Sequence, residues 1–342
     1  MTRTLQTSLP LNFVYTTPFD VDALLAAPSF EHHAVHDEAF RALVSSQGDI
    51  CWAVQTYALM RERGIDNIRL TMAPSRDCIN VLHSEVLRHA GADPARFDIC
   101  VQADFSYRPS AHFHLLQNED FVGGNRVCIW LYPQAGIIPR QAPEGRMQRV
   151  GYLGHVNNNL VWKHARWQEF LDPLGVEFVT APASQWHDFS DLDAVIAIRG
   201  FGHKRYSSKP PSKLINAWLA GVPFIGGSDS AYRQIGTPDE DFLLATNPDE
   251  VAVAIRRLRD EPGLVAKLVR NGRERARNFT VDTLIDRWCE VIEGPVEQRY
   301  RTWRSRPALE GARTRAMWAA DRGLLRAKGI LKGLRHTFKA SR

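Results

Sequence analysis

The stretch Lys209–Gly227 constrains the fold of this chain more than any other. Its two prolines hold the entry extended, because a residue that precedes proline is excluded from the helical region. Ser212 suits the N-cap of a helix that runs to about Ala220, and Gly221 suits the stop at its C-terminal end. A short apolar run then predicts a buried strand. A helix that passes directly into a strand is typical of an α/β sheet.

Basic residues surround the start of this predicted helix. Lys209 and Lys213 flank its N-terminus, where unpaired backbone amides already favour an anion. The loop before it, residues 199–209, begins at Arg199 and carries further cations and two glycines, which leave the backbone free to wrap a ligand. We expect Arg199, Lys209, Ser212 and Lys213 to hold a diphosphate and Asn216 to hydrogen-bond an attached sugar or ribose. An ordinary βα unit with solvated lysines is the alternative.

The elements on either side of this stretch carry a resemblance. A buried strand over residues 193–199 precedes it, and a strand, a turn and a helix over residues 242–258 follow it. Over about residues 151–292 the order resembles the nucleotide-binding half of GT-B glycosyltransferases, and the N-terminal half resembles them more loosely. The resemblance implies two Rossmann-like domains that face a cleft. Ser208 and Asn216 stand where the large retaining family has two glutamates, so inversion or retention is not implied.

Length and composition limit the class of protein. A chain of 342 residues with 44% hydrophobic residues can bury two cores. It contains no apolar run long enough to span a membrane, and its N-terminus lacks the apolar core of a signal peptide. The five cysteines are scattered and form no C-x-x-C pair, which predicts reduced cysteines and a cytoplasmic location.

The N-terminal half predicts alternating strands and helices with polar residues at strand ends. His83 ends the strand 78–83 and Asp104 ends the strand 97–104, at the sheet edge where open α/β folds bind ligands. Asp104 is a candidate general base for an acceptor hydroxyl, and His83 is a second candidate catalytic group. Both could instead be capping or core residues. Gly48 lies in a turn before a helix, where the resemblance places a contact with the donor.

Breaking residues divide the chain into domains. Prolines and glycines crowd residues 133–148, which predicts a linker between an acceptor domain over 1–148 and a donor domain over 149–300. The donor domain opens with a strand that ends at Gly154, followed by a turn from His155. The resemblance implies that Gly154 lets the donor approach closely and that His155 also lies at the donor-binding site.

Two features could suggest a metal ion, and we reject both. His32, His33 and His36 cluster without carboxylate or cysteine partners at ligand spacing, which favours a polar loop or short helix. Asp191 and Asp193 form a D-x-D triplet directly before a buried strand, and two carboxylates alone do not make a site. We therefore expect no metal and no cofactor, because cationic side chains would offset the charge on the leaving diphosphate.

The C-terminal residues 301–342 differ from the body in charge. They hold 12 of the chain's Lys and Arg residues against 2 acidic residues, whereas the rest of the chain is mildly acidic. Apolar residues at heptad spacing predict a basic amphipathic helix over 308–342, which could lie on an anionic membrane surface. The alternative is a closing helix that crosses back to the N-terminal domain. Nucleic-acid binding is not expected, because the body carries no reader motif.

The sequence thus predicts a metal-independent glycosyltransferase that moves a sugar from a nucleoside-diphosphate donor to an acceptor hydroxyl. The acceptor would be a glycan or a lipid-linked glycan in polysaccharide or glycolipid synthesis, at the inner face of the membrane. A non-catalytic scaffold that binds a sugar nucleotide is the alternative, motivated by the missing glutamates.

Overall fold

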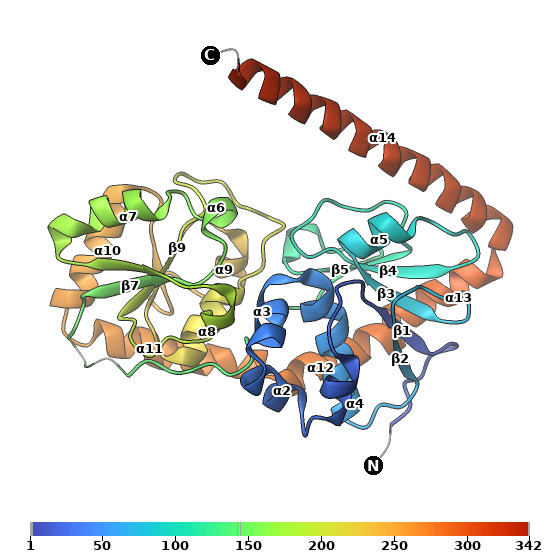
Figure 1. The fold of residues 1–342 in the computed structure, drawn as a ribbon, viewed down its shortest axis with the longest axis horizontal. Coiled ribbons are helices and arrows are strands. Elements are labelled where there is room, and N and C mark those ends of the chain that lie inside the picture. Colours follow the sequence, from blue (N-terminus) through green and yellow to red (C-terminus); the bar gives the residue numbers. More distant parts are fainter. Residues whose placement is uncertain (1–2, 142, 144, 341–342) are drawn as a thin grey trace.

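The structure is a computed structural model that describes residues 3–141, 143 and 145–340, with side chains except at residues 158 and 324–340. Two α/β domains stand side by side (Figure 1). A main hydrophobic core lies in each, with a second, smaller cluster in the first, and we call the two units the N-domain and the C-domain. The predicted linker lies between them: Tyr132 and Ala135 belong to the first core and Met147 to the second.

The N-domain is built on a parallel sheet of six strands in the order β2-β1-β3-β4-β5-β6. Its four inner strands are buried on both faces, as parallel strands covered by helices are, whereas the two edge strands are only partly buried. The strands are β1 (Leu11–Val14), β2 (Ile68–Thr71), β3 (Ile79–His83), β4 (Phe97–Val101), β5 (Phe113–Leu116) and β6 (Arg126–Cys128). The helices are α1 (Val21–Ala26), α2 (Phe30–His36), α3 (Glu38–Ser46), the π-turn η1 (Ile50–Val54), α4 (Gln55–Glu62), α5 (Ser84–Ala90) and the 3-10 turn η2 (Glu119–Phe121).

The C-domain has a parallel sheet of five strands in the order β11-β10-β9-β7-β8. The strands are β7 (Arg149–Tyr152), β8 (Glu177–Thr180), β9 (Ala194–Ala197), β10 (Phe224–Gly226) and β11 (Leu243–Leu244). The helices are α6 (Val156–Asn159), α7 (His164–Leu171), α8 (Ser212–Ala220), α9 (Ser230–Ile235), α10 (Pro248–Asp260) and α11 (Leu264–Ala276), with short 3-10 turns η3 (Asp172–Leu174), η4 (Ala183–Gln185) and η5 (Arg277–Phe279). Gly221 ends α8 in the left-handed conformation with a φ of 68°, as the sequence predicts.

The predicted boundary at residue 300 is wrong. The helix α12 (Val281–Val291) crosses back, and its apolar face joins the N-domain core. Trp288 is fully buried there, with its ring centroid 6.2 Å from that of Phe13 on β1. Periodicity reveals that α12 is amphipathic, but it does not reveal which domain covers the apolar face.

Two further helices pack on the N-domain after the π-turn η6 (Ile292–Val296). They are α13 (Glu297–Ser305) and the long helix α14 (Pro307–Ala340), which leaves the body as a rod (Figure 1). Glu310, Thr314 and Asp321 of α14 are buried against the domain. Part of the predicted tail is therefore docked, and the side chains of its heptad residues beyond 323 lie outside the described residues. Within the described residues, none of the helices is long and apolar enough to cross a membrane.

Local details refine the remaining predictions. The His32 and His36 rings stack on one face of the short helix α2. Asp193 is fully buried and accepts from Arg146 Nε at 2.8 Å and from two backbone amides, while Asp191 also pairs with arginines. The D-x-D triplet thus anchors the linker to the start of β9. The turn predicted after Gly154 is the one-turn helix α6.

Candidate functional site

The two domains meet at the carboxyl ends of their strands, the edge where open α/β sheets bind ligands. Asn118, after β5, donates from Nδ2 to Lys209 O at 3.2 Å and to Ser230 Oγ at 3.0 Å. Gln234 of α9 donates to Asn118 Oδ1 at 3.0 Å. Arg205 pairs with Asp120 beside these contacts. These polar contacts clamp one side of the interface.

Two connected cavities lie between the domains. The larger, of about 480 Å³, is lined mainly by N-domain residues, together with Pro210 of the C-domain. The smaller, of about 110 Å³, is lined by the linker, by Leu153 after β7 and by the start of α8. Ser45, Cys51 and Leu131 line both, so the cavities are two parts of one cleft.

Asp49 builds the N-domain wall of the cleft. Its carboxylate accepts from the backbone amides of Thr16 and Thr17, at 2.7 and 2.8 Å, and from both hydroxyls. Burial pushes the pKa of Asp49 up, but these hydrogen bonds more than offset it and hold the pKa below its usual value. The loop after β1 and the turn before η1 are thereby held together, which places Gly48 at the cavity.

Gly48 lies directly against the imidazole of His83. A Cβ on Gly48 would stand 2.3 Å from His83 Nε2, closer than any van der Waals contact allows. The glycine is therefore required for the close approach of the histidine. The sequence predicts that Gly48 contacts the donor; the structure places it in the cavity lining, in contact with His83.

His83 is buried in the lining of the larger cavity. The backbone amide of Glu85 donates to its Nδ1 at 3.4 Å, while Nε2 has no partner in the protein. Burial lowers the pKa of His83, so the ring is neutral near pH 7. The proton of a neutral ring whose Nδ1 accepts must reside on Nε2. His83 is thus arranged to donate a hydrogen bond, which argues against its acting as a base.

Asp104 lies across the cleft from the loop that precedes α8. Its carboxylate forms an ion pair with Lys209 Nζ at 2.5 Å. Burial raises the pKa of Asp104, but the bond and charge of Lys209 more than compensate and the pKa falls below its usual value. Ala103, the residue before it, has a positive φ of 49°, which is uncommon for a residue with a side chain. The structure therefore brings together Asp104, which the sequence predicts to act on the acceptor, and Lys209, which it predicts to bind the donor.

Cationic groups converge on the C-domain wall. Arg199, after β9, is held by Asp229 Oδ1 at 2.6 Å and by Asn159 Oδ1 at 2.6 Å. Lys213, in the first turn of α8, has its ammonium 5.1 Å from the ring centre of Tyr152. Burial, followed by the charges of Arg199 and Lys209, lowers the pKa of Lys213 to about 7. The carboxylates of Asp229 and Asp104 act in the opposite direction but do not offset these effects.

Gly154 makes room for this lysine. A Cβ at residue 154 would lie 2.6 Å from Lys213 Nζ and 3.1 Å from the Tyr152 hydroxyl. The sequence predicts that Gly154 allows a donor to approach; the structure shows that it allows Lys213 to approach. His155, the next residue, is exposed and packs against Trp186 at 4.8 Å between ring centres.

The start of α8 differs slightly from expectation. Pro211 occupies the N-cap and Ser212 is the first helical residue, with no side-chain cap bond, so the prediction that Ser212 caps the helix is wrong. Asn216 exchanges hydrogen bonds with Gln134 of the linker, at 3.2 and 3.4 Å. Ser212 and Asn216 both line the smaller cavity, and their role in donor binding stays a prediction.

The structure adds residues that sequence patterns do not single out. Asp229, Tyr152 and Tyr232 surround Arg199, and burial raises the pKa of the Asp229 carboxyl. Asn118 clamps the interface from a strand end. The sequence gives no signal for Asp229, which stands in the polar stretch 227–230 after β10, and its partner Arg199 lies 30 positions away.

Metal ligands do not gather here. In the part of the chain that the structure describes, no group of three or more histidine, cysteine or carboxylate side chains could hold a metal ion. Metal independence itself stays a prediction.

At the level of sequence, a known family matches the part of the chain that contains the C-domain. Residues 144–290 match the model of a family described as glycosyl transferase-like. No curated protein sequence matches the chain significantly. Among solved structures, AviGT4, a glycosyltransferase involved in avilamycin A biosynthesis, has a TM-score of 0.52 and 15% identity, covering 87% of this chain and 98% of that one.

Two other structures are more distant. Anabaena Alr3699/HepE in complex with UDP-glucose has a TM-score of 0.48 and 11% identity over 83% of this chain and 99% of that one. TarM has a TM-score of 0.47 and 11% identity over 64% of this chain, which spans only 55% of TarM. The AviGT4 likeness and the two facing parallel sheets show the GT-B fold, and residues 144–290 of this chain form a glycosyl transferase-like domain.

Proposed function

We propose that this glycosyltransferase moves a sugar from a nucleoside diphosphate, held by the C-domain, to a hydroxyl of an acceptor held in the N-domain cavity. The observation that carries the proposal is the gathering of Arg199 and Lys209 around Lys213, which lines the smaller cavity, within the domain that matches the family. Fixed cations at the N-terminus of α8 suit a diphosphate, whose negative charge increases as the sugar departs.

Asp104 is the proposed general base. In the free protein it is bound by Lys209, and its pKa is low, which makes it a weak base. A diphosphate that binds near Lys213 competes for Lys209. Once Lys209 turns to the phosphate, burial dominates and the pKa of Asp104 rises toward the range useful for accepting a proton. Donor binding would thus activate the base, with the neutral ring of His83 in the wall of the same cavity.

The N-domain cavity suits a neutral, hydroxyl-rich acceptor. Its lining includes Thr16, Thr17, Ser45 and Ser46, and no Lys or Arg is among the lining residues that the structure describes. Phe105, which is 36% exposed, offers an apolar face on which a sugar ring can stack. A glycan or lipid-linked glycan in polysaccharide or glycolipid synthesis has this chemistry.

We also propose that the reaction needs no metal and takes place at the inner face of a membrane. The cations of the C-domain would neutralise the leaving diphosphate without a divalent ion. The basic helix α14 would approach anionic lipids. Loss of turnover on chelation, with recovery on adding a divalent cation, would contradict the first part.

Thermal-shift screening against nucleoside diphosphates and their sugars tests the donor site. A ligand that binds only the folded state raises Tm in proportion to the logarithm of its concentration. We expect one base to stand out and Lys213→Ala to lose the shift. Lys163→Ala, at an exposed lysine of the same domain, should keep it. A non-catalytic scaffold would show the shift but no turnover with any acceptor, and no shift at all would overturn the donor site.

A further inference from the structure

A second large cavity lies far from the cleft, at the edge of the N-domain sheet where β3 and β4 begin. It has a volume of about 540 Å³, is open to solvent, and lies between the loops before these strands and the helices α13 and α14. Leu9, Pro94, Trp303 and Pro307 supply apolar wall. The indole Nε1 of Trp303 is buried without a partner in the protein. Nothing in the proposed transfer of a sugar uses this cavity.

Three arginines line the same cavity. Arg76 is paired with Asp93 at 2.8 Å, and Asp77 is the acidic residue in the lining. Arg304 donates to the Tyr300 hydroxyl at 2.9 Å. Among the described side chains, Arg304 and Arg315 form no ion pair with a carboxylate. The lining therefore combines apolar walls with a net positive charge, which is the chemistry that an anionic amphiphile needs.

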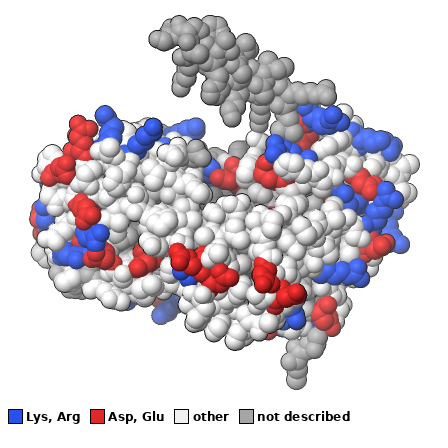
Figure 2. Space-filling view, viewed as in Figure 1, with Lys and Arg blue, Asp and Glu red and all other residues white. Residues whose placement is uncertain are grey.

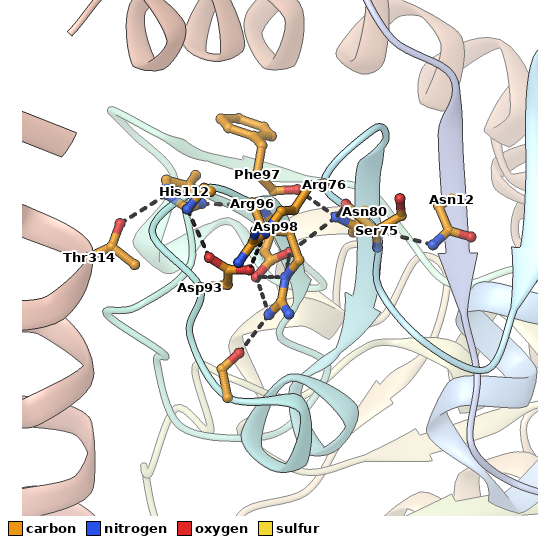
Figure 3. A network of polar contacts seen from close by, with 12 residues as sticks. Asn12, Ser75, Arg76, Asn80, Asp93, Arg96, Phe97, Asp98, His112 and Thr314 are labelled. Atoms are coloured by element: carbon orange, nitrogen blue, oxygen red, sulfur yellow. Dashed lines mark hydrogen bonds and ion pairs between the residues drawn. The ribbon is translucent and has the colours of Figure 1, made fainter. Parts of the chain in front are cut away.

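The walls of the cavity are held by a buried polar network (Figure 3). Arg96 and Asp98 form an ion pair at 2.8 Å with both side chains almost fully buried. The amide of Asp98 donates to His112 Nδ1 at 3.1 Å, so the neutral ring carries its proton on Nε2 and donates to Thr314 of α14 at 3.2 Å. Because these groups are bonded to each other, α14 is fixed against the loops that form the cavity.

The outer face of α14 continues this surface. Both acidic residues of the helix, Glu310 and Asp321, are turned inward and are 7% and 3% exposed. Glu310 binds Arg299 at 2.6 Å, and Asp321 lies 3.6 Å from Arg108. Up to residue 323, the exposed face therefore carries only basic and uncharged side chains, including Leu309, which is 62% exposed. Figure 2 shows Lys and Arg gathered at this right-hand end of the molecule, over α13 and the first turns of α14.

We propose that this cavity binds the phosphate-bearing headgroup of an anionic phospholipid, with the acid-free face of α14 lying on the bilayer around it. The inference rests on the membrane part of the proposed function and is independent of the donor site. Arg304 and Arg315 would bind the phosphate, while the apolar wall and Leu309 contact the upper acyl region. A bilayer is favoured over a soluble phosphate because the exposed apolar residues would have no role with the latter.

Co-sedimentation of the full-length chain with vesicles tests the proposal. We expect binding to phosphatidylcholine vesicles that contain phosphatidylglycerol and none to phosphatidylcholine alone. The double change Arg304→Glu with Arg315→Glu should weaken binding by about tenfold or more, since each cation near an anionic surface contributes about 1 kcal/mol. The control Arg256→Glu with Arg270→Glu reverses two exposed arginines of the C-domain and should change it little.

A variant that fills the cavity distinguishes binding in the cavity from general electrostatic attraction to the vesicle surface. Ala308 is exposed and lines the cavity, so Ala308→Trp should fill it without removing charge and should weaken vesicle binding. Binding that Ala308→Trp leaves unchanged or strengthens would overturn the cavity as the site. Equal binding to polyuridine RNA, or a Tm shift with inorganic phosphate but no vesicle binding, would overturn the lipid. An unchanged nucleotide-induced Tm shift shows that each variant is folded and that the donor site is intact.

Discussion

The two walls of the cleft differ in the charge of their side chains. On the N-domain wall, Asp49 is saturated by hydrogen bonds from Thr16 and Thr17, and His83 is neutral. On the C-domain wall, burial, followed by the charges of Arg199 and Lys209, lowers the pKa of Lys213 to about 7. The first wall suits a neutral polar ligand, and the second stores electrostatic free energy that an anion would release.

Lys209 and Asp104 connect the two walls, and Asp104→Asn tests that link with the largest expected effect. Turnover should fall by about 100-fold or more, because general-base catalysis contributes on that order. Nucleotide diphosphate affinity should instead rise several-fold, because Lys209 is no longer occupied by a carboxylate. Steady-state kinetics and calorimetric titration measure the two. Loss of affinity together with turnover would mean that Asp104 supports the donor site structurally.

On the C-domain wall, Lys213→Met should lower the affinity for the nucleotide but raise the stability of the free protein. Nucleotide affinity should fall by about 10- to 100-fold, since a charge-assisted hydrogen bond contributes about 1.5–3 kcal/mol. The free protein should become more stable at pH 7. The pKa of Lys213 is lower in the folded state than in the unfolded state. Between about pH 7 and the ordinary pKa of lysine, the unfolded chain therefore binds more protons than the folded protein does. Lys213 thus lowers the free energy of unfolding in this range, and its removal should raise it.

Because Lys213 is only half-buried, we expect a gain of about 1 kcal/mol, or a few degrees in Tm. Urea titration of both proteins without nucleotide measures it. A less stable Lys213→Met protein would show that contacts of the lysine stem outweigh its unneutralised charge.

Matched glycine substitutions compare the two walls directly. Gly48→Ala must displace the rigid His83 ring or the backbone, since the new Cβ would lie 2.3 Å from Nε2. We expect turnover to fall about tenfold, stability to fall by about 1–3 kcal/mol and affinity for the diphosphate to change little. Gly154→Ala meets the flexible end of Lys213 instead, so it should lower affinity for the diphosphate with a smaller loss of stability. The reverse pattern would assign the diphosphate to the N-domain wall.

The pH dependence of nucleotide affinity is the smallest expected effect. A diphosphate prefers protonated Lys213, whose pKa in the free protein is about 7, so affinity should fall several-fold from pH 6 to pH 8. The Lys213→Arg protein keeps its positive charge over this pH range, while the ligand titrates in the same way with both proteins. Its affinity for the nucleotide should therefore depend less on pH. The same slope in both proteins would place the titrating group elsewhere.

Much of the fold is predictable from sequence, because each element depends on local patterns. The α8 helix ends at Gly221 as its residues predict, and the strand that ends at His83 lies where its apolar run places it. The strand predicted over 97–104 is shorter, because β4 ends at Val101, three residues before Asp104. The predicted domain boundary at residue 300 is wrong, because the apolar face of α12 packs on the N-domain. The sequence pattern shows that this face is covered but does not show which domain covers it. The functions assigned to individual site residues stay predictions.

The sequence by itself determines that cationic residues surround the start of α8 and that polar residues end the N-domain strands. Only the tertiary structure decides their pairing: Lys209 with Asp104, 105 positions apart, Gly48 against His83, and Gly154 against Lys213. The physical reason is that hydrogen bonds and steric contacts extend only a few ångströms. A residue's partner and the pKa that follows from it are therefore set by how the domains pack, which local sequence patterns do not encode.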